Sequence, residues 1–259
     1  MRKVIQTMRP ALFRLLTVFV CFVSCFGRAD ELRNLVSQRF PRTEGVEIVC
    51  WAVPQESEGF LSQIVVVQTA NDGSARVVWQ SSLEPAYSPR IRFVEEIMVS
   101  GVPIALVERQ NGAATSQLDI IGKVSGRFQR ILKIDGFQFD VAHLDGSKLP
   151  FIVAHTQGNI LDIPVIYRWN GSQFVDDSAS HPESYRELLI EDEEKIPSDS
   201  SGVVLVNLAK IAVLSGNRAE AKRILAEALS KERANGNAAN KETLRRIAEA
   251  LQDLGRSPR

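Results

Sequence analysis

Short runs of alternating apolar and polar residues fill most of the chain between Val46 and Asp176. Alternation over four to eight residues is the pattern of a half-buried β-strand. Two adjacent segments each contain four such runs. The expected strands are Ile91–Met98, Val102–Glu108, Gln117–Val124 and Arg127–Ile134 in the first segment, and Phe137–Leu144, Leu149–His155, Ile163–Trp169 and Gln173–Asp176 in the second.

Turn-forming dipeptides separate these runs. Asparagine, aspartate and glycine tolerate the positive φ angles of tight hairpin turns. We therefore expect reversals at Ser100-Gly101, Asn111-Gly112, Asp135-Gly136, Asp145-Gly146 and Asn170-Gly171.

The second segment repeats the first at an offset of 46 or 47 residues. A period of this length made of four strands matches one propeller blade. A single blade cannot bury both of its faces, so copies would have to stack. The alternative is that two unrelated pairs of hairpins coincide. The matching pairs are Phe93 and Phe139, Pro103 and Pro150, Gly112 and Gly158, Ile120 and Ile166, and Phe128 and Phe174.

The stretch from Phe139 to Val175 resembles a repeat of the FG-GAP/VCBS type found in bacterial exported β-propellers. The resemblance rests on the loop Leu144-Asp145-Gly146, on Pro150, and on the hairpin from Trp169 through Asn170-Gly171 to Phe174. In that family the loop often binds calcium through several carboxylates. Here it holds Asp145 alone, whereas calcium takes six to eight oxygen ligands, so we expect no calcium and no other cofactor.

The region before these segments predicts a third, degraded blade. Its expected strands are Val46–Val53, Leu61–Thr69 and Ala75–Gln80, with Leu83–Arg90 as a connector. Asp30–Phe40 has the apolar spacing of a short amphipathic helix that ends at Pro41. The expected fold class is mainly β with a helical tail (α+β). Three antiparallel four-stranded sheets would form an open propeller arc or a sandwich, or would close a ring by association of chains.

The pattern becomes helical after Ser180. Pro182 suits the first turn of a helix, and a Ser-rich linker from Pro197 to Gly202 follows. Further helices are expected over Val203–Leu214, Arg218–Lys231 and Lys241–Leu254. This tail resembles a tetratricopeptide repeat of one and a half units, and the alternative is a plain three-helix tail. The residues at the family's packing positions include Leu205, Leu208, Ala209, Ala212, Gly216, Ala221, Leu225 and Ala228.

The predicted domains are a signal peptide at 1–29, a β repeat domain at 30–180, a helix and linker at 181–202, and the helical segment at 203–259. Four basic residues precede an apolar stretch from Leu15 to Phe26, which is short for a membrane span. Gly27 and Ala29 suit cleavage before Asp30. The alternatives are a retained membrane anchor and lipidation at Cys25.

Removal of the signal peptide changes the charge. The whole chain has 31 basic and 31 acidic residues, and loss of the five basic residues before Asp30 leaves a net charge of −5. An acidic chain disfavours nucleic acid as a partner. Cys50 then remains as a single cysteine in an apolar run, which indicates a buried small hydrophobe rather than a nucleophile.

No local catalytic or metal-binding motif is present in the sequence. His143 and His155 would lie at opposite ends of a hairpin, and His181 precedes a helix, where a capping role is ordinary. We therefore expect no catalytic or metal residues and a non-enzymatic binding or scaffold protein of the bacterial envelope, periplasmic or secreted. Its expected partner is a protein, with a membrane involved only through Cys25 or a retained N-terminus, and oligomers are compatible with this. The alternative is a hydrolase or carbohydrate-active protein with a cleft between blades.

Overall fold

The computed structural model describes residues 33–55, 59–112, 115–155, 161–195 and 202–234, with residues 245, 249 and 252. The chain divides into two compact units: Met1–Asp135 with Gly171–Gln173, and Gly136–Asn170 with Phe174–Arg259. The predicted signal peptide, Cys25 and most of the helix expected over Lys241–Leu254 lie outside the described residues. None of the described helices has the length and apolar content that crossing a bilayer requires.

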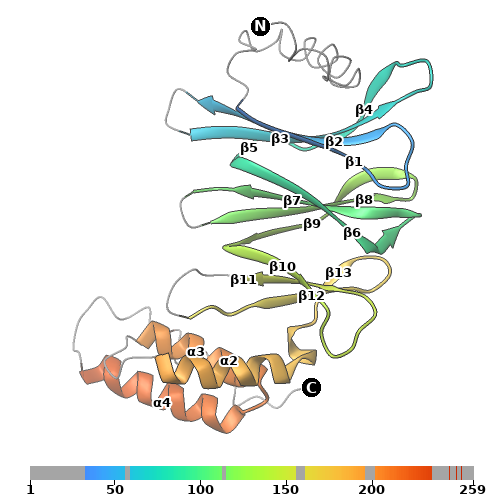
Figure 1. The fold of residues 1–259 in the computed structure, drawn as a ribbon. Helices are drawn as coiled ribbons and strands as arrows, with labels where there is room; N and C mark the ends of the chain where they lie inside the picture. The colour runs from blue at the N-terminus through green and yellow to red at the C-terminus, as the bar shows by residue number, and fades with distance from the viewer. Residues whose placement is uncertain are drawn as a thin grey trace, which may run out of the picture. The chain divides into compact units, whose positions relative to one another are not determined.

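The expected fold class is confirmed: three antiparallel sheets, each a four-stranded meander, are followed by helices (Figure 1). The first sheet has the order β1-β2-β3-β4, and the short β5 pairs with β3. The other two have the orders β6-β7-β8-β9 and β10-β11-β12-β13. The strand bounds are β1 Arg33–Arg39, β2 Val46–Gln55, β3 Gly59–Thr69, β4 Ala75–Gln80, β5 Glu84–Pro85, β6 Tyr87–Val99, β7 Val102–Gln110, β8 Ser116–Val124, β9 Arg127–Gly136, β10 Gln138–Ala142, β11 Phe151–His155, β12 Val165–Trp169 and β13 Phe174–Asp176.

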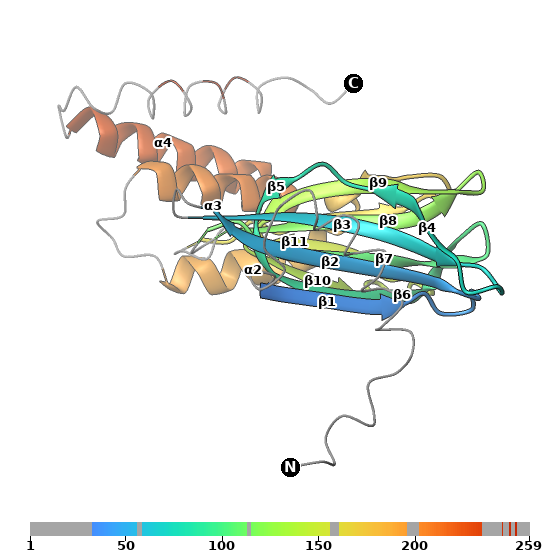
Figure 2. The same ribbon diagram turned by 90° about the horizontal axis from the view of Figure 1, so that it is seen from above.

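Asp30–Phe40 was expected to be helical, and this prediction is wrong. Residues Arg33–Arg39 form β1, which lies beside β2 (Figure 2). The two strands pair antiparallel, with Ser37 opposite Val49. Val36 packs into the core of the first unit, whereas Leu35 remains 45% exposed. The same apolar spacing fits a strand here, because the ladder with β2 stabilises this segment, whereas a short isolated helix is only marginally stable in water.

The connector expected over Leu83–Arg90 is also partly wrong, since it contains β5 and the start of β6. Of the expected turns, Ser100 and Gly101 both have positive φ and join β6 to β7, as a tight two-residue hairpin requires. Asp135-Gly136 is not such a turn, because Gly136 ends β9 and lacks a positive φ. A Cβ at Gly136 would stand 2.9 Å from the carbonyl oxygen of His155, so close packing selects glycine there.

The first unit has its core between its two sheets. Ile48 and Ile64 from the first sheet and Ala105 and Ile121 from the second belong to one buried cluster. Phe40 fills its centre and lies against two aromatic rings from the second sheet, at centroid distances of 5.1 Å to Phe93 and 4.9 Å to Phe128.

The second unit covers one sheet with helices. The helices are α2 Pro182–Lys195, α3 Gly202–Leu214 and α4 Arg218–Ala234, preceded by the short helix η2 Ser178–Ser180. Helix α2 extends through the acidic run Glu191–Glu194 to Lys195. Phe151 and Ile166 of the sheet share a buried cluster with Tyr185 of α2, Leu205 of α3 and Leu225 of α4.

The two repeated segments have the same strand order, and their registers agree in part. Leu106 lies opposite Ile120 in β7–β8, and Val153 lies opposite Ile166 in β11–β12, which preserves the offset of 46 or 47. In the first hairpins Phe93 lies opposite Ala105, but Phe139 lies opposite Ala154, a difference of two residues. A register shift in β6 between Val94 and Met98 accompanies this difference. A shift of two residues keeps each side chain on its face of the sheet.

The small residues of the helical tail generate a prediction about α4. Ala228 is fully buried in the core, whereas Ala226, two residues earlier on the same helix, is exposed. Ala228→Leu is expected to destabilise the protein by about 1–3 kcal/mol, because extra methyl groups overpack a filled core. Ala226→Leu should change stability by less than about 0.5 kcal/mol. Urea denaturation followed by circular dichroism checks this, and equal midpoints for the two variants would contradict it.

Candidate functional site

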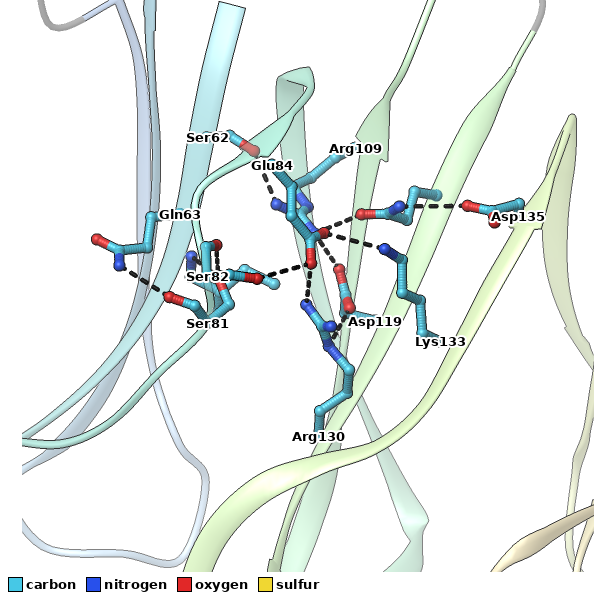
Figure 3. A network of polar contacts seen from close by, with 12 residues as sticks. Ser62, Gln63, Ser81, Ser82, Glu84, Arg109, Asp119, Arg130, Lys133 and Asp135 are labelled. Carbon is cyan, nitrogen blue, oxygen red and sulfur yellow. Dashed lines mark hydrogen bonds and ion pairs between the residues drawn. The ribbon is translucent and has the colours of Figure 1, made fainter.

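The densest group of charged side chains in the described residues lies between the two sheets of the first unit (Figure 3). Its centre is Arg109 on β7, whose side chain is 0% exposed. Burying a guanidinium is strongly unfavourable unless charges and hydrogen bonds compensate it. The partners of Arg109 therefore decide whether the two sheets can close.

Both sheets supply partners to Arg109. From the first sheet, Ser62 Oγ accepts a hydrogen bond from Nη1 at 2.8 Å, and Glu84 Oε2 accepts one from Nη2 at 2.8 Å. From its own sheet, Gln117 Oε1 accepts at 2.6 Å, and Asp119 forms a short ion pair with Nη2. One guanidinium thereby joins four side chains from β3, β5 and β8.

Strand register explains how these side chains meet. Ser62 on β3 lies opposite Glu84 on β5, and Arg109 on β7 lies opposite Gln117 on β8. Asp119 is two residues beyond Gln117, so it lies on the same face as a diagonal neighbour of Arg109. The contacts therefore follow from the pairing of four strands.

Two further cations from β9 complete the network. Arg130 places Nε 2.5 Å from Asp119 Oδ1 and Nη2 3.1 Å from Glu84 Oε1. Lys133 Nζ lies 3.3 Å from Glu84 Oε2. Arg130 is 25% exposed and Lys133 is 37% exposed, so the network reaches solvent on the β9 side.

The two carboxyls of the network differ in pKa. Burial by itself would raise the pKa of Glu84, but the guanidiniums of Arg130 and Arg109 outweigh burial and bring the pKa to about 2. Burial raises the pKa of Asp119, although the same two arginines act in the opposite direction. Glu84 is thus held as a carboxylate that binds three cations from the facing sheet.

This network joins the first sheet to the second, and we call it the clasp. Glu84 and Asp119 each face at least two cations, and arginine does not give up its proton in proteins. Such a set of charges holds strands in one arrangement, because a shift of either sheet would leave a buried charge without its partner.

A second polar cluster lies in the other unit around His181, which is 5% exposed. Its Nδ1 is 2.5 Å from Asp145 Oδ2, its Nε2 is 3.5 Å from Asp177 Oδ2, and its ring meets Phe151 edge-on at 4.7 Å. The backbone N–H of His181 also caps η2 by donating to Ser178. The side chain thus does more than the capping role expected of it: it ties the turn at Asp145 to the start of α2.

The two other histidines and Cys50 do not share a site. His143 Nδ1 lies 3.2 Å from the carbonyl oxygen of Ser147, and His155 pairs with Asp140 and Asp162, so these two histidines lie at opposite ends of the β10–β11 hairpin as expected. The described residues contain no group of three ligating side chains suited to a metal ion. Cys50 is fully buried, and burial raises the pKa of its thiol to about 12, as expected for a small hydrophobe.

Most structural repeat positions lie in the interiors of their own units, whereas Phe93 is half-buried and Gly216 is exposed. Trp169 and Phe174 pack together at 5.2 Å in β12–β13, and Lys123 stands over the Phe128 ring at the matching positions of β8–β9. Pro103 is the second residue of β7, and Pro150 directly precedes β11. In the helical tail, Gly216 has a positive φ in the turn between α3 and α4. The remaining positions are buried: Phe128, Phe139, Trp169, Phe174, Ala209, Ala221 and Ala228.

Sequence reasoning missed the charge network altogether. The available signal was Asp119, an ionisable residue set between Leu118 and Ile120 in an expected strand. Charged residues in such an apolar setting are buried only when paired. The pattern could not name the partners, because Ser62 and Glu84 come from another sheet.

Comparison of the chain with protein-family models, with curated proteins and with solved structures finds no match. The resemblances to FG-GAP/VCBS and tetratricopeptide repeats therefore stay predictions.

The buried pair of Asp119 and Arg109 should dominate the stability of the first unit. Asp119→Asn is expected to cost about 3–5 kcal/mol, because it leaves the buried Arg109 short of compensating charge. The control is Arg42→Gln, which removes an exposed pair with Glu95 and should cost less than about 1 kcal/mol. Urea denaturation measures both, and a loss for Asp119→Asn no larger than the control would refute the clasp.

Acid should weaken the same clasp through Glu84. Its pKa of about 2 in the folded protein lies below its ordinary value of 4.5. The carboxylate therefore contributes stability that is fully present above pH 4.5 and is lost as pH falls towards 2. Urea midpoints measured across this range should fall more steeply for the wild type than for Glu84→Gln. If the urea midpoints of the two proteins fell in parallel with pH, Glu84 would not be the source of the acid dependence of stability.

Proposed function

We propose that this chain is an exported binding or scaffold protein of the bacterial envelope, periplasmic or secreted, that presents β and helical surfaces to a protein partner. The N-terminal sequence supports export, since a basic segment and a short apolar stretch precede Asp30. The three meanders and the paired helices α3 and α4 support a binding role, because regular sheets and paired helices offer extended surfaces to partners.

The observation that carries the proposal is the internal pairing of the charge network. Arg109 and Asp119 are fully buried, and Glu84 is bound by cations from the facing sheet. The charges of these groups pair with one another and thereby join the two sheets. The most elaborate polar arrangement described in the chain thus builds a rigid frame, which suits a protein that displays a surface.

The edge of β1 is the surface that we assign to the partner. β1 pairs with β2, and no described strand pairs with its other side. An exposed edge presents backbone N–H and C=O groups that an extended segment of another protein can bind as an added strand. Leu35 on this strand is 45% exposed and offers an apolar contact beside those backbone groups.

Site-specific photo-crosslinking in cells tests this assignment. A photo-reactive residue at Leu35 should yield a discrete protein adduct in the envelope fraction. Leu83 is the matched control, because it is 41% exposed in the same unit but lies in the connection before β5. The proposal predicts an adduct at Leu35 and none at Leu83.

Absence of an adduct at Leu35, or equal adducts at both positions, would overturn the assignment of the β1 edge. Assays of the purified full chain on polysaccharide substrates examine the alternative function. Hydrolysis that withstands further purification would replace the binding proposal by an enzymatic one.

A further inference from the structure

His155 is the last residue of β11 and lies between two carboxylates of the second unit. Its Nδ1 forms a short pair with Asp162, and its Nε2 lies 3.2 Å from Asp140 Oδ2. Asp140 comes from the neighbouring strand β10, and Asp162 comes from the connection that leads to β12. Among the described residues, these are the charged groups that face the ring from the elements packed against it.

The described part of this connection, residues 161–164, is held from two sides. Leu161, next to Asp162, is 3% exposed and belongs to the core that the sheet shares with the three helices. Tyr185 of α2 donates a hydrogen bond of 2.5 Å to the carbonyl oxygen of Pro164. Residues 161–164 therefore contact both His155 at the end of β11 and Tyr185 of α2.

The geometry favours one protonation state of His155. A neutral imidazole has one N–H and can donate to one carboxylate, whereas the imidazolium donates from both ring nitrogens. The hydrogen bond with Asp162 raises the pKa of His155 above its ordinary 6.5, and the charges of Asp162 and Asp140 act in the same direction against burial. The stabilisation is thus fully present below pH 6.5 and is lost as pH rises through the higher folded pKa.

We infer that His155 is a pH-dependent latch that fastens residues 161–164 to the sheet and thereby supports the packing of the helices on it. When the imidazolium loses a proton, it loses its positive charge and one of its two bonds to carboxylates. The contact with Asp162 is then no longer an ion pair, so Asp162 is held less firmly and the packing of Leu161 against the helical core weakens. The helices of this unit become easier to open at alkaline pH. The inference does not rest on the proposed function.

Hydrogen exchange of the full chain tests the latch. After correction for intrinsic exchange rates, the amides of Leu161 and Ile163 should lose protection as the pH rises above 6.5, because the raised pKa of His155 moves its deprotonation upward. In His155→Gln the side chain has no charge to lose, so protection at these amides should be low and independent of pH.

His143→Gln serves as the matched control, because His143 contacts only the loop carbonyl of Ser147 in the described structure. This variant should keep the pH dependence of the wild type. Loss of the pH dependence in this control, or its survival in His155→Gln, would overturn the latch.

A direct titration keeps the inference testable if His155→Gln fails to fold. NMR of the wild type should show that His155 titrates above 6.5 and that its pKa falls in Asp162→Asn, since the first cause of the raised value is the bond to Asp162. Titration of the wild-type His155 at or below 6.5 would overturn the inference.

Discussion

A single buried guanidinium constrains the first unit of this protein. Arg109 has no exposed surface, and its partners Ser62 and Glu84 belong to the first sheet whereas Gln117 and Asp119 belong to its own. The free energy lost when this charge leaves water is compensated only when both sheets supply its partners. The aliphatic core supplies attraction that has no fixed direction, whereas each charge of the network needs its partner in place.

The second unit also buries one face of a sheet, but it does so with helices rather than with a second sheet. Its helices bury an apolar face of β11 and β12, and two histidines hold segments beside the helical part: His181 holds the start of α2, and His155 holds the connection between β11 and β12. His181 stands between Asp145 and Asp177 at the start of α2, and His155 stands between Asp140 and Asp162 at the end of β11. Arginine joins the strands of two sheets in the first unit, whereas histidine joins loops and strands in the second.

The two repeated segments show how far a sequence repeat constrains geometry. Trp169 packs on Phe174 where Lys123 stands over Phe128, so a ring-on-ring contact and a cation over a ring occupy matching positions. The first hairpins differ by two residues in register, which a shift within β6 accommodates without moving any side chain to the opposite face. Strand order is thus shared, while the turns and the chemistry at equivalent positions have diverged.

The sequence by itself determined the strands of the repeated segments, the turns at Gly101 and Gly146, and the buried faces of α3 and α4. These features depend on local alternation, on backbone conformations open to glycine, and on the spacing of small and large residues, all of which are written within a few positions of the chain. Tertiary structure alone decided the rest. Residues 33–39 became a strand because β2 lies beside them, and Arg109 found Ser62 and Glu84 because two sheets meet, a proximity that no local pattern encodes.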